Sequence, residues 1–147
     1  MDDTANIDDV IARLDNADER MLDGDCGLWK ELLSHREDVT LLGAYGGHVR
    51  GWDKVSARLA QTATGYTGGG GTTTRTNIST WIGTDLACVV DLEEHRTRLG
   101  PTADATRFVY RTTHVLRRDA TNGWTVLLRH PDPLALFQGP ALAHTPR

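Results

Sequence analysis

Three stretches of the chain carry apolar residues at the spacing of a helix face. In the first, Ile7, Val10 and Leu14 recur at i, i+3 and i+7, and acidic residues crowd its start, where the helix dipole favours them. The second carries Leu28, Trp29, Leu32 and Leu33 after Asp25, a residue that can cap a helix, and the third carries Trp52, Val55, Leu59 and Ala63 ahead of Gly65. The pattern therefore predicts three helices, with breaks at residues 23–25, near His35 and at Gly65.

Most of the remaining pattern is typical of strands. Gly46 and Gly47 stand between two short extended runs, 38–43 and 48–51, which predicts a tight hairpin. Longer β-like runs cover residues 74–82, 84–96, 105–118 and 124–130. Helices that come first and antiparallel strands that follow, joined by connections too short for crossover helices, indicate an α+β fold. We expect the helices to cover one face of a strongly curved antiparallel sheet.

Length and charge limit the organisation and the partners. With 147 residues, we expect one domain over residues 1–147, with a core of about 5–137 and a loosely ordered tail at 138–147. The formal net charge of −4 attracts neither nucleic acid nor an anionic membrane. No apolar run approaches the roughly 20 residues that span a bilayer, and the acidic start differs from a secretory signal. We therefore expect a cytoplasmic protein.

Four segments together resemble a known family. They are REDVT at 36–40, GGHVRGWD at 46–53, YRTTHVLR at 110–117 and GWTVLLRHPDPL at 123–134. They resemble the SnoaL-like branch of the nuclear transport factor 2-like (NTF2-like) superfamily, over roughly residues 5–137, and the order of predicted elements agrees. The resemblance implies a cone-shaped fold around a deep pocket, pairing as homodimers, and relatives that include ketosteroid isomerase, polyketide cyclases, limonene epoxide hydrolase and scytalone dehydratase. Because this fold hosts many reactions, it does not settle the function.

The last predicted strand offers a candidate proton carrier. Strict alternation would put Trp124, Val126, Leu128 and His130 on one face, which is mostly apolar and should face the core. His130 would then end an inward-facing row at the pocket mouth, where an imidazole can act as a general acid or base. Asp132, held between two prolines, is a candidate to orient it. The alternatives are a histidine that only fixes the chain end and a carboxylate that only caps the next segment.

A second candidate pair joins two strands. Arg111 would need a carboxylate partner or an anionic ligand if it pointed into the pocket, because an unpaired buried guanidinium is costly. Glu93 on the neighbouring strand is the candidate partner, and an exposed cross-strand ion pair is the alternative.

The spacing of the candidate ligands does not match a known metal-binding motif. Glu93, Glu94, His95 and His48 suggest a metal site, but the sequence contains no His-x-x-x-His on a helix and no Cys-x-x-Cys. We therefore expect neither a metal nor a cofactor. Five aromatic side chains are candidates for pocket walls or ligand contacts: Trp29, Tyr45, Trp52, Phe108 and Trp124.

Two functions remain open from the sequence. The first is a cofactor-independent enzyme of the isomerase, cyclase or dehydratase type, in which His130 carries a proton, Asp132 orients it, and Arg111 or Tyr45 steadies a developing enolate oxygen in a hydrophobic, oxygenated small molecule. The second is a binding protein or dimeric accessory subunit of the same fold, without catalysis.

Overall fold

The computed structural model describes residues 3–66, 70–98, 104–120 and 123–134. Within these ranges the helices are α1 (Asp3–Leu22), α2 (Gly27–Leu32) and α3 (Trp52–Ala63). The strands are β1 (Thr40–Leu42), β2 (His48–Arg50), β3 (Gly71–Ile82), β4 (Leu86–Arg98), β5 (Ala105–Asp119) and β6 (Gly123–Pro133). The predicted α+β class is confirmed. The tail predicted at 138–147 lies outside the described residues.

The helices form where the apolar spacing predicts them. Ile7, Val10 and Leu14 of α1 are all buried, and the same stripe continues through Ala17 and Met21. Asp25 assists the start of α2, because its carboxylate accepts a hydrogen bond of 2.8 Å from the Gly27 N–H. No helix among the described residues combines the length and the apolar character needed to cross a membrane.

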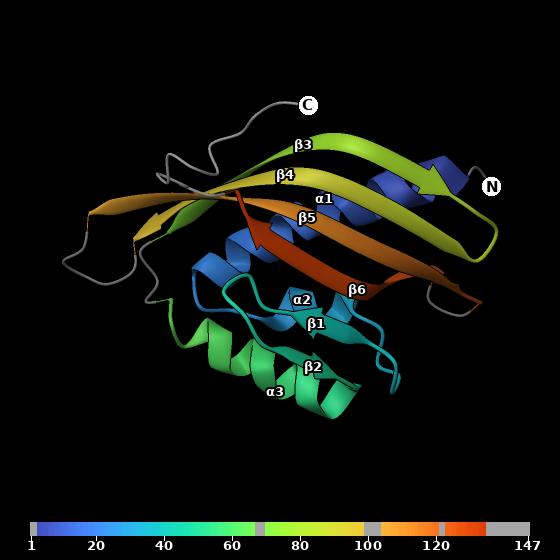
Figure 1. Ribbon diagram of the computed structural model, residues 1–147, viewed down its shortest axis with the longest axis horizontal. Coiled ribbons are helices and arrows are strands. Elements are labelled where there is room, and N and C mark those ends of the chain that lie inside the picture. Colours follow the sequence, from blue (N-terminus) through green and yellow to red (C-terminus); the bar gives the residue numbers. More distant parts are fainter. Residues whose placement is uncertain (1–2, 67–69, 99–103, 121–122, 135–147) are drawn as a thin grey trace, which may run out of the picture.

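One six-stranded sheet, in the order β2-β1-β6-β5-β4-β3, carries the fold. Neighbouring strands are antiparallel except β1 and β6, which run parallel and align Leu41 with Arg129. The predicted hairpin joins β1 to β2, and Gly46 and Gly47 adopt φ values of 112° and 79°, which favour glycine. The long strands β3 to β6 curve around α1, while α2 and α3 lie beside β1 and β2 (Figure 1).

Burial along β4 divides the inner face of the sheet into two parts. Alternate residues point inward, and the row begins with the apolar Ala87 and Val89. It continues with Asp91, Glu93 and His95, which are equally buried. The apolar part belongs to the core with α1 and α2, whereas the polar part lies next to a cavity.

Candidate functional site

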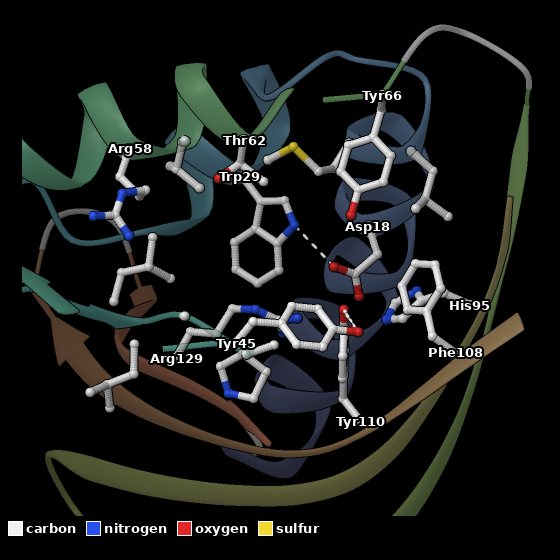
Figure 2. Close-up of a pocket in the computed structure, with 18 of the residues that line it drawn as sticks. Asp18, Trp29, Tyr45, Arg58, Thr62, Tyr66, His95, Phe108, Tyr110 and Arg129 are labelled. Carbon is white, nitrogen blue, oxygen red and sulfur yellow. Dashed lines mark hydrogen bonds between the residues drawn. The ribbon is translucent and has the colours of Figure 1, made fainter. Parts of the chain in front are cut away.

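A cavity of about 310 Å³ lies between the helices, the β1–β2 turn and the polar part of the sheet. Aromatic side chains supply much of its wall: Trp29, Tyr45, Tyr66, Phe108 and Tyr110. Figure 2 shows the hydroxyls of Tyr45, Tyr66 and Tyr110 and the carboxylate of Asp18 pointing toward the same part of the cavity. An apolar wall with a few convergent polar groups is typical of a small-molecule site.

Asp18 is the acidic side chain of this lining. It lies four residues after Leu14 and three before Met21, so helix geometry places it on the buried face of α1. Its carboxylate accepts hydrogen bonds from the Trp29 indole N–H at 3.0 Å and from Arg75 Nη2 at 2.9 Å. Burial, and then the negative charge of Glu93, raise the pKa of Asp18 to about 6. The group is therefore mostly ionised at pH 7 and takes up a proton as the pH falls through about 6.

Arg75 forms ion pairs with Asp18 and with the acidic side chains behind it. This guanidinium, on β3, has only 4% of its side chain exposed. Besides Asp18, it donates to Asp15 at 2.6 Å and to Asp91 at 3.0 Å, and it lies 3.4 Å from Glu93. Buried charges persist when they are paired and hydrogen-bonded. Arg75 supplies both conditions for three carboxylates and pairs with Glu93 by charge.

Arg129 provides the second buried guanidinium. Its Nη1 and Nη2 donate to the two Glu93 oxygens at 2.7 and 3.2 Å. Nη1 also lies 2.9 Å from His114 Nε2, which must accept because a guanidinium only donates. The guanidinium carbon sits 5.0 Å from the centre of a Trp29 ring. Arg129 thereby connects the sheet to the aromatic wall of the pocket.

The pKa values of Glu93 and His114 are both lowered, which leaves one residue charged and the other neutral. Burial opposes ionisation of Glu93, but the charge of Arg129 and hydrogen bonds from His95 and Arg129 outweigh it and hold the pKa of Glu93 well below its usual value. Burial and then the charge of Arg129 lower the pKa of His114 to about 3. At neutral pH Glu93 is thus an anion and His114 a neutral imidazole, whereas Asp18 can exchange a proton.

Tyr66 and Tyr110 have raised pKa values and remain protonated. Tyr110 donates to the Tyr45 hydroxyl at 3.5 Å. Burial and this contact raise the pKa of Tyr110, and burial raises that of Tyr66. Phenol O–H groups that stay protonated can donate hydrogen bonds to a ligand oxygen.

Asp18, Glu93 and His95 also offer ligand atoms within 4.8 Å of one another, close enough for one metal ion. Both carboxylates, however, already face guanidinium groups: Arg75 contacts Asp18, and Arg129 contacts Glu93. A divalent ion there would meet two fixed positive charges on the atoms it needs. We therefore assign this cluster to charge balance between side chains.

Strict alternation along β6 is wrong after Val126. Val115 pairs with Leu128 but Leu116 pairs with Val126, so Leu127 is an extra residue in a β-bulge. The bulge reverses the side-chain order: the Arg129 side chain is only 12% exposed, whereas His130 is exposed. The expected inward-facing row therefore does not reach His130, which is not among the described residues that line the cavity.

The other candidate residues separate into two groups. Arg111 forms an exposed ion pair with Asp132 of the neighbouring strand β6. The expected Arg111–Glu93 pair does not form, because Glu93 stands opposite Tyr110 in the register and points inward. Glu93 is buried behind the pocket. The catalytic roles assigned to His130, Asp132 and Arg111 stay predictions, now without a place in the cavity.

The predicted aromatic residues divide in the same way. Trp29, Tyr45 and Phe108 line the cavity. Trp52 instead stacks on His35, with ring centroids 3.8 Å apart, and Trp124 is buried in the core. Neither of these two is among the described cavity residues.

Several important residues were missed from the sequence. A usable signal existed for Asp18, because it interrupts the apolar stripe of α1 at a position that faces the core. A similar signal exists on β4, where the inward row that begins with Ala87 and Val89 becomes charged at Asp91. Arg129 had no such signal, since the bulge that turns it inward has no sequence signature that we recognise.

Comparison with known proteins identifies the fold. No protein-family model matches the chain, and no curated protein matches it. Among solved structures, a proposed dehydratase of the NTF2-like family from Streptomyces avermitilis has a TM-score of 0.74 at 19% identity, covering 90% of this chain and 97% of its own. A ketosteroid isomerase-like protein from Erwinia carotovora atroseptica has a TM-score of 0.71 at 18% identity, with 89% and 95% covered.

A CaMKII hub from S. rosetta is similar as well, with a TM-score of 0.61 at 17% identity over 84% of this chain and 93% of the hub. These likenesses show that the chain has the cone-shaped fold of NTF2-like proteins. At such identities they show the fold alone.

Proposed function

We propose that this protein, which has an NTF2-like fold, is a cofactor-independent enzyme of the isomerase, cyclase or dehydratase type, and that Asp18 is its general base. One observation carries the proposal: a carboxylate with a pKa of about 6 lines a cavity walled by aromatic and aliphatic side chains. A general base works best when its pKa lies near the operating pH. Perturbed pKa values also cluster at functional sites.

The reaction begins with removal of a proton from a carbon next to a ligand carbonyl. The Asp18 carboxylate takes this proton, and the electron pair of the C–H bond moves onto the carbonyl oxygen as an enolate. Tyrosine hydroxyls of the pocket donate hydrogen bonds to that oxygen, in the manner of an oxyanion hole. Asp18 then returns the proton to another carbon, or protonates a hydroxyl that departs as water.

The names of two structural neighbours support this class of reaction, since one is described as a proposed dehydratase and another as ketosteroid isomerase-like. The segments at 110–117 and 123–134 support the finer assignment to the SnoaL-like branch. Tyr45 keeps the enolate-steadying role assigned to it from the sequence. Asp18 takes the proton-carrying role that the sequence assigned to His130.

Exchange of carbon-bound hydrogen for deuterium tests the proposal without knowledge of the product. The protein would be incubated in D₂O with 1-tetralone, 2-decalone and a 3-ketosteroid, and loss of the α-proton signals followed by NMR. The variants are Asp18→Asn and, as a matched control, Asp9→Asn, which removes the same charge from an exposed position of α1.

We expect wild type and Asp9→Asn to accelerate exchange of at least one ketone, and Asp18→Asn to lose about 10²- to 10⁴-fold of that acceleration. Equal rates for wild type and Asp18→Asn would contradict the assignment of Asp18. Saturable binding of the ketones without exchange would instead favour the non-catalytic binding protein. That alternative has its own support, because both oxygens of Asp18 already accept a hydrogen bond within the protein.

We also propose that the protein forms a homodimer. Large apolar side chains are exposed on the β3–β4 hairpin, among them Trp81 at 61% and Leu86 at 51%. A second copy would cover such residues, since contiguous exposed apolar groups commonly mark interaction sites. Sedimentation of wild type and Trp81→Ser tests this: a wild-type monomer, or a dimer unaffected by the substitution, would contradict the role of this surface.

A further inference from the structure

We propose that the natural ligand of this pocket carries a carboxylate group, and that Arg58 binds it at the opposite side of the pocket from Asp18. This inference rests on the proposed function, because it specifies the substrate class of the same site. Three observations support it: which arginines of the lining have partners, the glycine in the turn beside Arg58, and the negative charge of Asp18.

The arginines among the described pocket residues are Arg58 and Arg129. Arg129 is fully engaged by Glu93 and His114. Arg58, in contrast, makes no hydrogen bond or ion pair with any residue in the part of the chain that the structure describes. A half-buried guanidinium that borders a cavity without a carboxylate partner is suited to an anion from outside.

Arg58 projects from the middle of α3 toward the β1–β2 turn. A Cβ atom built on Gly47 would lie 3.4 Å from Arg58 Nη1 and 3.9 Å from Nη2. The glycine at this position therefore lets the guanidinium rest against the turn without a side chain in between. In Figure 2, Arg58 lies on one side of the Trp29 indole and Asp18 on the other.

The charge distribution favours a single carboxylate over a phosphate. One free guanidinium balances one negative charge, and the second guanidinium of the lining is already neutralised by Glu93. The Asp18 carboxylate repels an anion at the other side of the cavity. A ligand with an anionic end and a neutral carbonyl end would thus bind with its anion at Arg58 and its carbonyl near Asp18.

Equilibrium binding of two nearly isosteric probes tests the inference. 2-Naphthoate carries a carboxylate and 2-naphthamide a neutral amide on the same ring system, and their affinities can be measured by isothermal titration calorimetry at pH 7.5. The variants are Arg58→Gln, Asp18→Asn and Lys54→Gln. Lys54 is the matched control, because it lies one turn earlier on α3, is exposed, and does not line the pocket.

We expect wild type to bind 2-naphthoate at least tenfold more tightly than 2-naphthamide, as a charge-assisted hydrogen bond would provide. Arg58→Gln should abolish this preference while leaving the affinity for 2-naphthamide nearly unchanged, and Lys54→Gln should retain it. A preference that survives in Arg58→Gln, an absence of preference in wild type, or no binding of either probe at millimolar concentration would each overturn the inference.

Asp18→Asn separates this inference from the proposed function. Because Asp18 lies away from Arg58, the variant should retain the carboxylate preference even though it loses hydrogen exchange. Retained preference together with undiminished exchange would contradict only the proposed catalytic role. Lost preference in Arg58→Gln together with no exchange in wild type would leave a carboxylate-binding protein without catalysis.

Discussion

Replacing Glu93 by glutamine keeps the size of the side chain and removes the negative charge that neutralises Arg129. Glu93 is fully buried, and both of its oxygens accept hydrogen bonds from Arg129. Removal of one member of a buried ion pair typically costs about 3–5 kcal/mol, because the other charge stays buried without its partner. The Arg129 side chain keeps 12% of its surface exposed, so we expect the lower end, about 3 kcal/mol. For a domain of this size, that lowers the melting temperature by roughly 6–12 °C.

Glu94→Gln is the matched control for this prediction. It is the same substitution one residue further along β4, on the opposite face of the sheet. Glu94 accepts hydrogen bonds from Arg96 and Arg107, two arginines whose side chains are more than half exposed to solvent. We expect only a small loss of stability, because water replaces such pairs easily.

Urea unfolding of wild type, Glu93→Gln and Glu94→Gln at pH 7, followed by circular dichroism, measures both effects. The folded pKa of Glu93 lies below its ordinary value of 4.5. Its stabilisation is therefore present above pH 4.5 and is lost as the pH falls toward the folded pKa. The difference between wild type and Glu93→Gln should accordingly shrink in acid. Equal losses for the two variants at pH 7, or a difference that grows in acid, would refute this account of the buried charges.

Three further substitutions test other parts of the site. His114→Leu should flatten the pH dependence of stability between about pH 3 and 6.5. In this range the free energy of unfolding of wild type falls by up to about 1.4 kcal/mol per pH unit as the pH falls, because the unfolded chain binds a proton that buried His114 does not bind. Urea unfolding across this range measures the slope. Trp29→Phe removes the indole N–H that donates a hydrogen bond to Asp18, so it should lower the free energy of unfolding by about 1–3 kcal/mol. It should also raise the pKa of Asp18 further, which carboxyl ¹³C shifts would show. Gly71→Ala should destabilise the fold by about 1–3 kcal/mol in thermal unfolding, because the new Cβ would lie 2.6 Å from Leu22 Cδ1.

Elements with strong periodicity could be predicted from the sequence, and irregular ones could not. The apolar stripe of α1 and the paired glycines of the β1–β2 hairpin each depend on neighbours within a few residues, so local sequence determines them. The parallel pairing of β1 with β6 joins segments about 90 residues apart, and nothing local specifies it. The α+β class followed from the order of elements, whereas the sheet order required the structure.

In the site, too, residues on regular elements could be predicted and those that depend on an irregularity could not. Trp29 and Phe108 could be predicted as pocket residues, since large aromatic side chains near an apolar core commonly become walls. Tyr45, which was also predicted, instead borders the cavity from the β1–β2 turn and is 80% exposed. His130 and Arg129 lie on the opposite faces of the sheet from those predicted, because the bulge at Leu127 shifts the alternation by one residue. A shift of one residue moves every later side chain to the other face. Asp18 could have been predicted as a site residue from the sequence, because a charged residue in a buried helix stripe needs a partner or a function.

The pKa of the Asp18 carboxyl group decides whether this residue can act as a proton carrier, and its measurement needs no substrate. Carboxyl ¹³C chemical shifts of protein labelled at aspartate would be followed from pH 3 to pH 8, with Asp18→Asn identifying the resonance. We expect a midpoint of about 6 for Asp18. A midpoint at or below its ordinary value of 3.8 would rule out Asp18 as the general base, because a carboxylate that is fully ionised and firmly paired with Arg75 would be a structural anion and not a proton carrier.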